Sequence, residues 1–450
     1  MKSRVSAAAV RPRPVRLLKY WLGRPVRLLR SGRGAVLLIA GAIVLGINMR
    51  AAITSLPPIF PELESALHLS AGTLSLLAAI PVLCFGVFSG AGAPLSRRFG
   101  EERVLGMAIV LLAAGLLLRG ASPSVLLFPG TVIAGAAIAL LNVLLPSLVK
   151  RRIPERAGLV IGLYLAMLSG GAIVASAVAV PVFNAAGGGA TSGSASVRIA
   201  LGLWAAPAVL AAVLWMPQLR YRTVPGGTPA ATAAGEARPA ATRSAGALAM
   251  GRSALAWQVT AFMGLQSLLY YATLSWFPTM FRERGVSAVH AGDLLALMNF
   301  GNAVTCLLIP VLAHRAADQR KLAVAAVAAT GVGIAGAVFG PAALAPVCIA
   351  VLGLGQGATL GLAIFYTMAR APDPATAASL SAFAQGVGYL VASAGPLTIG
   401  FLHDATGGWT LPGVVLLGVA AVELAGGWLA GRALTVPGAR LLKPTLVPQE

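Results

Sequence analysis

One basic side chain, Arg50, lies inside a long apolar run of this 450-residue chain. A charge at the centre of a bilayer costs about 2.5–3.5 kcal/mol on insertion scales, so an ionisable group in such a run is a functional candidate. A guanidinium offers a fixed fork of donors that fits a planar anion. Thr54 follows one helical turn later on the same face. We therefore expect an anion site at Arg50; the alternative is an arginine that snorkels to the nearby interface.

Uncharged polar residues form faces on other apolar runs, at the spacing of helical turns. In lipid, such side chains either bond helices together or line a wet cavity. Their concentration on the first, fourth, seventh, tenth and eleventh runs favours a cavity. With Arg50 and Thr54, the candidate substrate-binding residues are Asn142, Gln266, Tyr270, Gln356, Gln385 and Tyr389.

Acidic residues are scarce in the apolar runs, and Glu423 is the clear exception. It lies in the last run, where a structural or interfacial carboxylate is the expected role. The first, fourth, seventh and tenth runs contain neither Asp nor Glu. A proton, which the sequence leaves open as a coupling partner, would therefore ride on the substrate or bind elsewhere.

The composition identifies an integral membrane protein. Hydrophobic residues make up 58% of the chain and charged residues 10%, against roughly 25% charged residues in soluble domains. The net charge of +21 does not indicate a nucleic-acid partner, because the basic residues lie between apolar runs rather than on one face. The histidines and cysteines are scattered without the spacing of a metal site or a catalytic pair. We expect no enzyme, no cofactor, no metal and no ATP drive.

Twelve apolar runs are long enough to cross a bilayer, which takes about 20 residues. They predict an all-α integral membrane fold of twelve transmembrane helices. The approximate runs are 34–55, 71–92, 103–120, 124–148, 157–182, 198–218, 254–280, 289–314, 321–340, 343–368, 376–402 and 410–432.

The orientation follows from the basic residues, which favour cytoplasmic segments. With the N-terminus in the cytoplasm, 29 of the 34 Lys and Arg residues fall in cytoplasmic segments. Four fall in the outer loops, Arg119 among them, and Arg50 is the only one placed inside a span. We expect both termini on the cytoplasmic side of a bacterial inner membrane.

An internal repeat divides the chain into two parallel halves of six helices. The stretch 95–103 (LSRRFGEER) recurs as 312–320 (LAHRAADQR), 217 residues later. The predicted parts are a basic cytoplasmic tail (1–33), an N-terminal bundle (34–218), a cytoplasmic linker (219–253), a C-terminal bundle (254–432) and a cytoplasmic tail (433–450). The repeated loops are expected to gate the cytoplasmic side through Arg97, Arg98, Arg103, Arg315, Asp318 and Arg320.

The first of these loops resembles the signature loop of the major facilitator superfamily, although Arg97 stands where that signature has Asp. Further stretches resemble the cyanate and 2-nitroimidazole transporter branch of the superfamily. They are residues 48–55 (NMRAAITS), 81–86 (PVLCFG), 142–146 (NVLLP), 264–267 (GLQS), 276–278 (WFP), 353–357 (GLGQG), 385–389 (QGVGY) and 403–404 (HD). The resemblance implies the major facilitator fold and secondary transport of a small anion or small polar molecule.

The sequence therefore predicts a secondary transporter that works by alternating access on a cyanate- or nitroimidazole-like solute. The alternatives are a proton-coupled drug exporter of the same superfamily and a membrane sensor that does not transport. The expected partners are a small-molecule substrate and the lipid bilayer, and the expected state is a monomer.

Overall fold

Every predicted apolar run forms a helix in the computed structural model, which describes residues 33–187, 193–220, 250–316 and 318–436. Lipid offers the backbone no water, so each run satisfies its own amides and carbonyls as a helix. The helices of the first half are α2 (Arg33–Thr54), α3 (Phe60–Leu67), α4 (Ala71–Phe88), α5 (Gly92–Phe99), α6 (Glu101–Ala121), α7 (Pro123–Arg152), α8 (Ala157–Ala185), α9 (Gly193–Gly202) and α10 (Ala205–Trp215).

The second half repeats this pattern with helices of its own. They are α12 (Ala254–Glu283), α13 (Ala288–Arg315), α14 (Arg320–Phe339), α15 (Ala345–Ala369), α16 (Pro374–Ala392), α17 (Ala394–Thr406) and α18 (Thr410–Ala430). The predicted eleventh run divides into α16 and α17 at Ser393, because Pro396 has no amide hydrogen to continue the helical bonding. The predicted sixth run likewise divides into α9 and α10.

Eleven helical segments of the described chain are long and apolar enough to cross a membrane. Helix α12 is not among them, although it has 30 residues and would span about 45 Å. Its polar residues lower its hydropathy, and most of its side chains are buried against other helices rather than exposed to lipid. The seventh predicted span thus runs through the protein interior.

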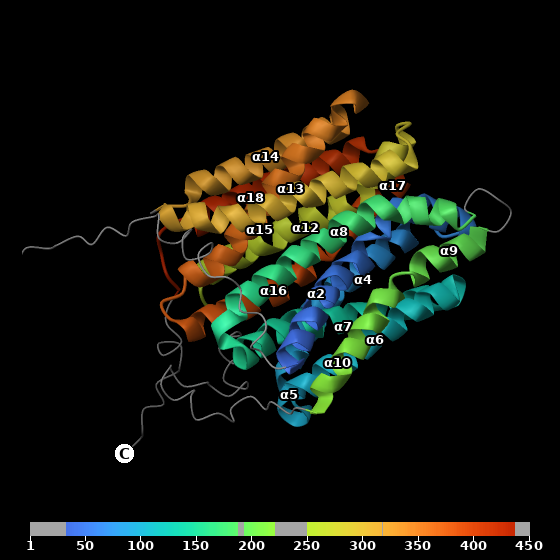
Figure 1. The fold of residues 1–450 in the computed structure, drawn as a ribbon. Coiled ribbons are helices and arrows are strands. Elements are labelled where there is room, and N and C mark those ends of the chain that lie inside the picture. The colour runs from blue at the N-terminus through green and yellow to red at the C-terminus, as the bar shows by residue number, and fades with distance from the viewer. Residues whose placement is uncertain (1–32, 188–192, 221–249, 317, 437–450) are drawn as a thin grey trace, which may run out of the picture.

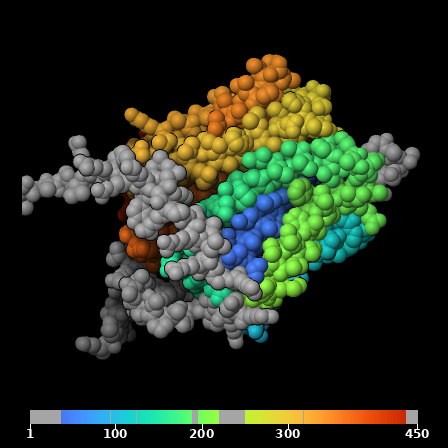
Figure 2. Space-filling model, in the orientation of Figure 1, coloured from blue at the N-terminus to red at the C-terminus, as the bar shows by residue number. Residues whose placement is uncertain are grey.

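The two halves lie side by side, as the blue-to-green and yellow-to-red helices of Figure 1 show. They meet along two seams, one between α8 and α13 and one between α4 and the pair α16 and α17. The first seam is visible in Figure 2, where α8 lies directly against α13. The tail before Arg33, most of the predicted linker and the chain after Val436 lie outside the described residues, so the predicted domain boundaries stay predictions.

The bundle has two unlike ends. We call the end where α7 finishes with Lys150–Arg152 and α13 with Arg315 the basic end, and the other the opposite end. At the opposite end, Arg282 of α12 forms an ion pair of 2.7 Å with Glu62 of α3. There too, the Asp404 carboxylate of α17 accepts a hydrogen bond of 2.9 Å from the Gly72 amide at the start of α4. Both contacts join the two halves.

Two glycines bring the seams into close contact at the opposite end. A Cβ atom at Gly292 of α13 would lie 2.7 Å from the Ser176 carbonyl oxygen of α8, and one at Gly400 of α17 would overlap the Ser75 hydroxyl of α4. Only a residue without a side chain fits at these two positions. The opposite end is therefore closed by direct packing as well as by polar contacts.

Arg119 differs from its predicted place in an outer loop. It lies in the last turn of α6 and is 1% exposed. Its Nη1 donates a hydrogen bond of 2.9 Å to the Ala52 carbonyl of α2, where the last carbonyls of that helix need partners. Arg50 is therefore not the only cation within a span of the described residues.

Candidate functional site

A cavity of about 310 Å³ lies between the two halves. Its walls come from α2, α4, α7 and α8 of the first half and from α12, α13, α15 and α16 of the second. The lining extends toward the basic end along α7, through Asn142 and Pro146, and along α15, through Leu360 and Ile364. The polar residues of the lining are Arg50, Ser89, Asn142, Tyr164, Ser169, Gln266, Ser267, Tyr270, Tyr271, Asn299, Asn302, Gln385 and Tyr389.

Arg50 is the one cation of the described cavity lining. Its guanidinium carbon lies 5.1 Å from the ring centroid of Tyr270 and 6.0 Å from that of Tyr271, within reach of a cation–π interaction. Its Nη1 donates a hydrogen bond of 3.2 Å to the Tyr271 hydroxyl. The described lining contains no Asp or Glu, so the charge of Arg50 is balanced in the cavity by aromatic faces and a phenol oxygen alone.

Hydrogen bonds between side chains fix the groups around Arg50. The Tyr270 hydroxyl donates to Asn299 Oδ1 at 2.8 Å, and Asn299 Nδ2 donates to Ser176 Oγ of the other half at 3.3 Å. In the first half, the Tyr164 hydroxyl donates to Asn142 Oδ1 at 3.1 Å. These bonds hold the wall rigid, which suits a site that must recognise one small solute.

Six of the eight predicted substrate-binding residues line this cavity. Gln266 Nε2 donates to the Ser267 hydroxyl at 2.6 Å, and Gln385 Nε2 donates to the Ser381 hydroxyl at 2.7 Å. Both amide groups are therefore oriented by their own helices. The six residues are Arg50, Asn142, Gln266, Tyr270, Gln385 and Tyr389.

The two other predicted residues, Thr54 and Gln356, are fully buried in helix contacts instead. The Thr54 hydroxyl donates to the carbonyls of Arg50 and Ala172, so it bonds α2 to α8. Gln356 Nε2 donates to Thr273 Oγ1 at 2.9 Å and bonds α15 to α12. For these two positions, helix packing describes the side chain better than the cavity does.

The cavity also contains residues that sequence reasoning missed. Tyr271, Asn299 and Asn302 are the most informative, and Asn302 Nδ2 is buried with no hydrogen-bond partner in the described structure. Asn299 and Asn302 are three residues apart in the predicted run 289–314. That spacing is the same helical-face signal that identified the other candidates.

Glu423 lies outside the cavity, on α18, and is fully buried. Neither of its carboxyl oxygens has a hydrogen-bond partner in the described structure. Helix α18 packs against α12 and α14, so this carboxyl group lies within the protein rather than at its interface with lipid or water.

The predicted gating arginines of the first loop, Arg97, Arg98 and Arg103, are exposed at the basic end. Two carboxylates, rather than these arginines, fasten the loop to the end of α7. Glu101 forms an ion pair of 3.1 Å with Arg151, and Glu102 lies 3.9 Å from Arg152. Both carboxylates are buried beneath the end of α7, which the sequence analysis did not foresee.

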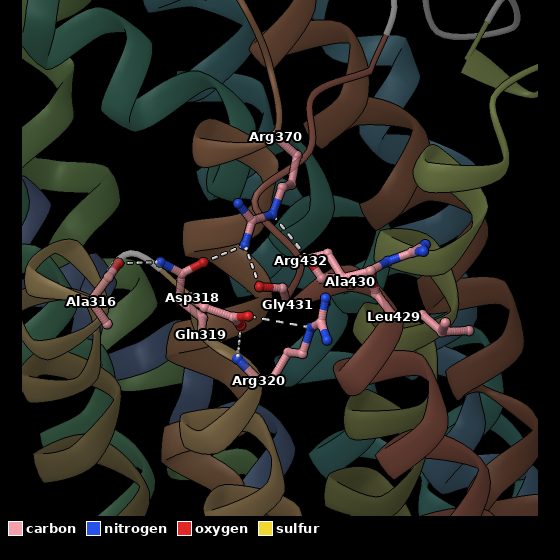
Figure 3. A network of polar contacts seen from close by, with 9 residues as sticks. All are labelled: Ala316, Asp318, Gln319, Arg320, Arg370, Leu429, Ala430, Gly431 and Arg432. Carbon is pink, nitrogen blue, oxygen red and sulfur yellow. Dashed lines mark hydrogen bonds and ion pairs between the residues drawn. The ribbon is translucent and has the colours of Figure 1, made fainter.

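The second loop takes part in a denser network, drawn in Figure 3. Arg370 donates to Gln319 Oε1 and to the carbonyls of Ala430 (2.9 Å) and Gly431 (3.1 Å). Of the predicted gating residues, Asp318 and Arg320 form a local ion pair of 3.4 Å, while Arg315 is exposed. Arg370 thus fastens the basic ends of α14, α15 and α18 together.

Two helical halves around a central polar cavity, closed at one end by contacts between the halves, are the architecture of a membrane transporter. Comparisons with known proteins agree. The family model for the Major Facilitator Superfamily matches residues 38–396. This chain belongs to that superfamily and is a multi-pass membrane transporter.

Among curated proteins, the 2-nitroimidazole transporter of Escherichia coli is 36% identical over 88% of this chain and 94% of that relative. The cyanate transport protein CynX of Escherichia coli is 30% identical over 85% of this chain and 95% of its own length. An uncharacterised transporter of Bacillus subtilis, YycB, is 36% identical over 88% of this chain and 93% of its own length.

Solved structures share the fold at low identity. A bacterial homologue of the human lysosomal transporter Spinster, solved in an inward-facing conformation, aligns with a TM-score of 0.70 at 16% identity, over 90% of this chain and 98% of that one. A D-xylose–proton symporter aligns with a TM-score of 0.69 at 16% identity, over 90% and 98%.

Proposed function

We propose that this transporter carries a small anion, or a small electron-rich planar solute, by alternating access. The observation that carries the proposal is Arg50, a guanidinium on the wall of a central cavity whose described lining has no carboxylate. A charge in such a place needs a counter-charge or strong acceptors. The solute would supply them.

The cavity also suits a small solute in size and chemistry. About 310 Å³ is at the lower end of the range for small-molecule pockets. The tyrosine rings beside Arg50 offer flat apolar faces, and Asn302 adds a polar residue to the wall from the second half. The printed functions of two relatives, cyanate and 2-nitroimidazole transport, support a solute of this kind.

The closed opposite end and the lining that reaches the basic end support a conformation open toward the basic end. The charge rule predicts that the basic end faces the cytoplasm, so this conformation would be inward-facing. We propose a monomer in the cytoplasmic membrane of a bacterium, with both termini inside. Solute release at that side would be followed by closure of the basic end and separation of Glu62 from Arg282.

Uptake into proteoliposomes tests the proposal, with cyanate, nitrite, 2-nitroimidazole and small carboxylates as solutes. Arg50→Gln keeps hydrogen-bond donors but removes the charge, and Arg50→Lys keeps the charge but loses the fork. We expect Gln to abolish saturable uptake and Lys to weaken affinity, with both variants inserted normally. Uptake by Arg50→Gln within about twofold of wild type, which corresponds to less than 0.5 kcal/mol, would refute the anion site.

A further inference from the structure

A hydrogen bond between Arg50 and Tyr271 joins the two halves inside the cavity. Arg50 belongs to α2 and Tyr271 to α12, and Arg50 Nη1 lies 3.2 Å from the Tyr271 hydroxyl oxygen. Both side chains line the cavity. A neutral phenol is thus the hydrogen-bond acceptor that the guanidinium uses in this conformation.

The neighbouring Tyr270 is held differently, because its hydroxyl donates its proton to Asn299. The bond to Asn299 Oδ1 measures 2.8 Å, and the centroid of the Tyr270 ring lies 5.1 Å from the guanidinium carbon of Arg50. Tyr271 packs edge-on against the Tyr270 ring, with centroids 5.1 Å apart. The contact of Tyr271 that a competing acceptor could replace is therefore its hydrogen bond from Arg50.

Tyr271 also forms part of the wall between the cavity and the closed end. It lines a second, very small hollow of about 10 Å³, together with Leu56 and Phe60 of the first half and Ser275 of α12. This hollow lies on the side of the Arg282–Glu62 ion pair. A bond from α2 to Tyr271 consequently holds both halves together at the inner edge of the closed end.

We propose that Tyr271 is an internal stand-in for the solute. Its hydroxyl accepts a hydrogen bond from Arg50 until an anionic solute takes its place. Displacement breaks a bond between the halves and so makes their movement depend on solute. The proposal rests on the proposed function, because it takes Arg50 as the anion-binding group. It names the solute class as one that presents an anionic or strongly accepting oxygen or nitrogen atom to a guanidinium.

The exchange is favourable because a charged acceptor forms a hydrogen bond roughly twice as strong as a neutral one. A solute shifts a conformational equilibrium only by the difference in its affinity for the two states. Here that difference in affinity arises from the Arg50–Tyr271 bond. The bond exists only while the opposite end is closed and no solute is bound to Arg50. The loaded transporter should therefore move faster than the unloaded one.

Tyr271→Phe tests this, because it keeps the ring and removes only the hydroxyl. The probe is cyanate or 2-nitroimidazole, whichever wild type takes up saturably. In wild type, solute inside the vesicle should accelerate uptake from outside. In Tyr271→Phe this acceleration should disappear, and affinity should rise by about tenfold, the size expected for one competing hydrogen bond to a charged group.

Tyr366→Phe is the matched control. Tyr366 is a fully buried tyrosine of α15 whose hydroxyl has no partner in the described structure, and it lies outside the cavity. It should keep the acceleration and the affinity of wild type. Wild-type acceleration in Tyr271→Phe would overturn the proposal.

A second measurement needs no transport. Ser275→Cys, in a protein whose three native cysteines are replaced by alanine, reports access from the opposite end through a membrane-impermeant maleimide. Solute should accelerate labelling when Tyr271 is present. With Tyr271→Phe, labelling should be fast without solute and should gain nothing from it. Equal dependence on solute in both proteins would overturn the stand-in role.

The two proposals fail separately. If Arg50→Gln transports normally, the anion site is wrong whatever Tyr271 does. If Arg50→Gln is inactive but Tyr271→Phe behaves as wild type in both measurements, the anion site stands and the stand-in role is wrong.

Discussion

Arg152 and Arg370 hold equivalent places in the two repeats, and each fastens three helices of its half at the basic end. Arg152 is the last residue of α7, donates to Gln218 Oε1 beyond α10 at 3.2 Å, and lies 3.9 Å from Glu102 of α6. Arg370 follows α15, and its partners are Gln319 before α14 and Gly431 after α18. The first half uses a carboxylate where the second uses an amide.

The Arg370 network predicts a loss of stability. Arg370→Met keeps an unbranched chain but removes every donor, leaving the Gln319 amide oxygen and the carbonyls of Ala430 and Gly431 without this partner. We expect a loss of roughly 3 kcal/mol, because several buried acceptors become unpaired. Thermal unfolding in detergent, followed by size-exclusion chromatography, measures it.

Arg97→Gln is the control for this experiment. Arg97 is exposed, so its variant should unfold within about 0.5 kcal/mol of wild type. Equal melting of Arg370→Met and Arg97→Gln would show that the network contributes nothing to stability.

Asn302→Asp should impair uptake of an anionic solute. Asn302 lines the cavity with an unpartnered Nδ2, and the substitution replaces that donor with a carboxylate in the cavity that contains Arg50. The new charge repels an anion and competes for the guanidinium. We expect uptake at low solute concentration to fall by more than about tenfold, equivalent to 1.4 kcal/mol.

Asn302→Ser, which adds no charge, separates the two effects of that change. It should retain most of the uptake that Asn302→Asp loses, as initial rates in proteoliposomes would show. A mild effect of Asp beside a severe effect of Ser would contradict the electrostatic argument.

Glu423→Gln should retain most transport. Neither carboxyl oxygen of Glu423 has a hydrogen-bond partner in the described structure, and glutamine reproduces the shape of the side chain. Uptake should stay within about twofold of wild type, since the change removes no contact, and its dependence on pH should be unchanged. Complete loss of uptake at normal expression would identify Glu423 as a coupling group.

The topology is open to a direct test with reporter fusions. The charge distribution predicts that fusions after Gln218 and after Arg440 read cytoplasmic and that a fusion near Gly188 reads external. The same experiment would establish that the basic end faces the cytoplasm. An external signal after Gln218 or Arg440 would be incompatible with the twelve-span arrangement.

The helices were predictable because lipid imposes one backbone solution on any apolar run of sufficient length. Arg50 was predictable for a related reason: a charge in such a run is rare and costly, so its position alone carries information. The position at which a predicted helix divides in two was harder to foresee. Helix α16 ends beside Ser393 because of Pro396, while other prolines, such as Pro81, lie inside unbroken helices.

The rest of the site depends on how each helix is rotated about its own axis. Thr54 lies one turn from Arg50, yet it faces α8 because the two helices pack closely there. Asn302 faces the cavity because α13 packs between α8 and α15. The buried carboxylates Glu101 and Glu102 depend on a tertiary contact as well, since the arginines that cover them come from the end of α7. Sequence spacing does not contain that information.

The glycines of the two seams make the closed end vulnerable to a single methyl group. Alanine at Gly292 or Gly400 would act as a wedge, because its Cβ would meet Ser176 or Ser75 across the boundary, while the cavity itself would be untouched. Each substitution would bias the protein toward the conformer that opens at the opposite end of the bundle. Such variants would be conformational traps, and they offer a practical route to a structure of the form that is closed at the basic end and open at the opposite end.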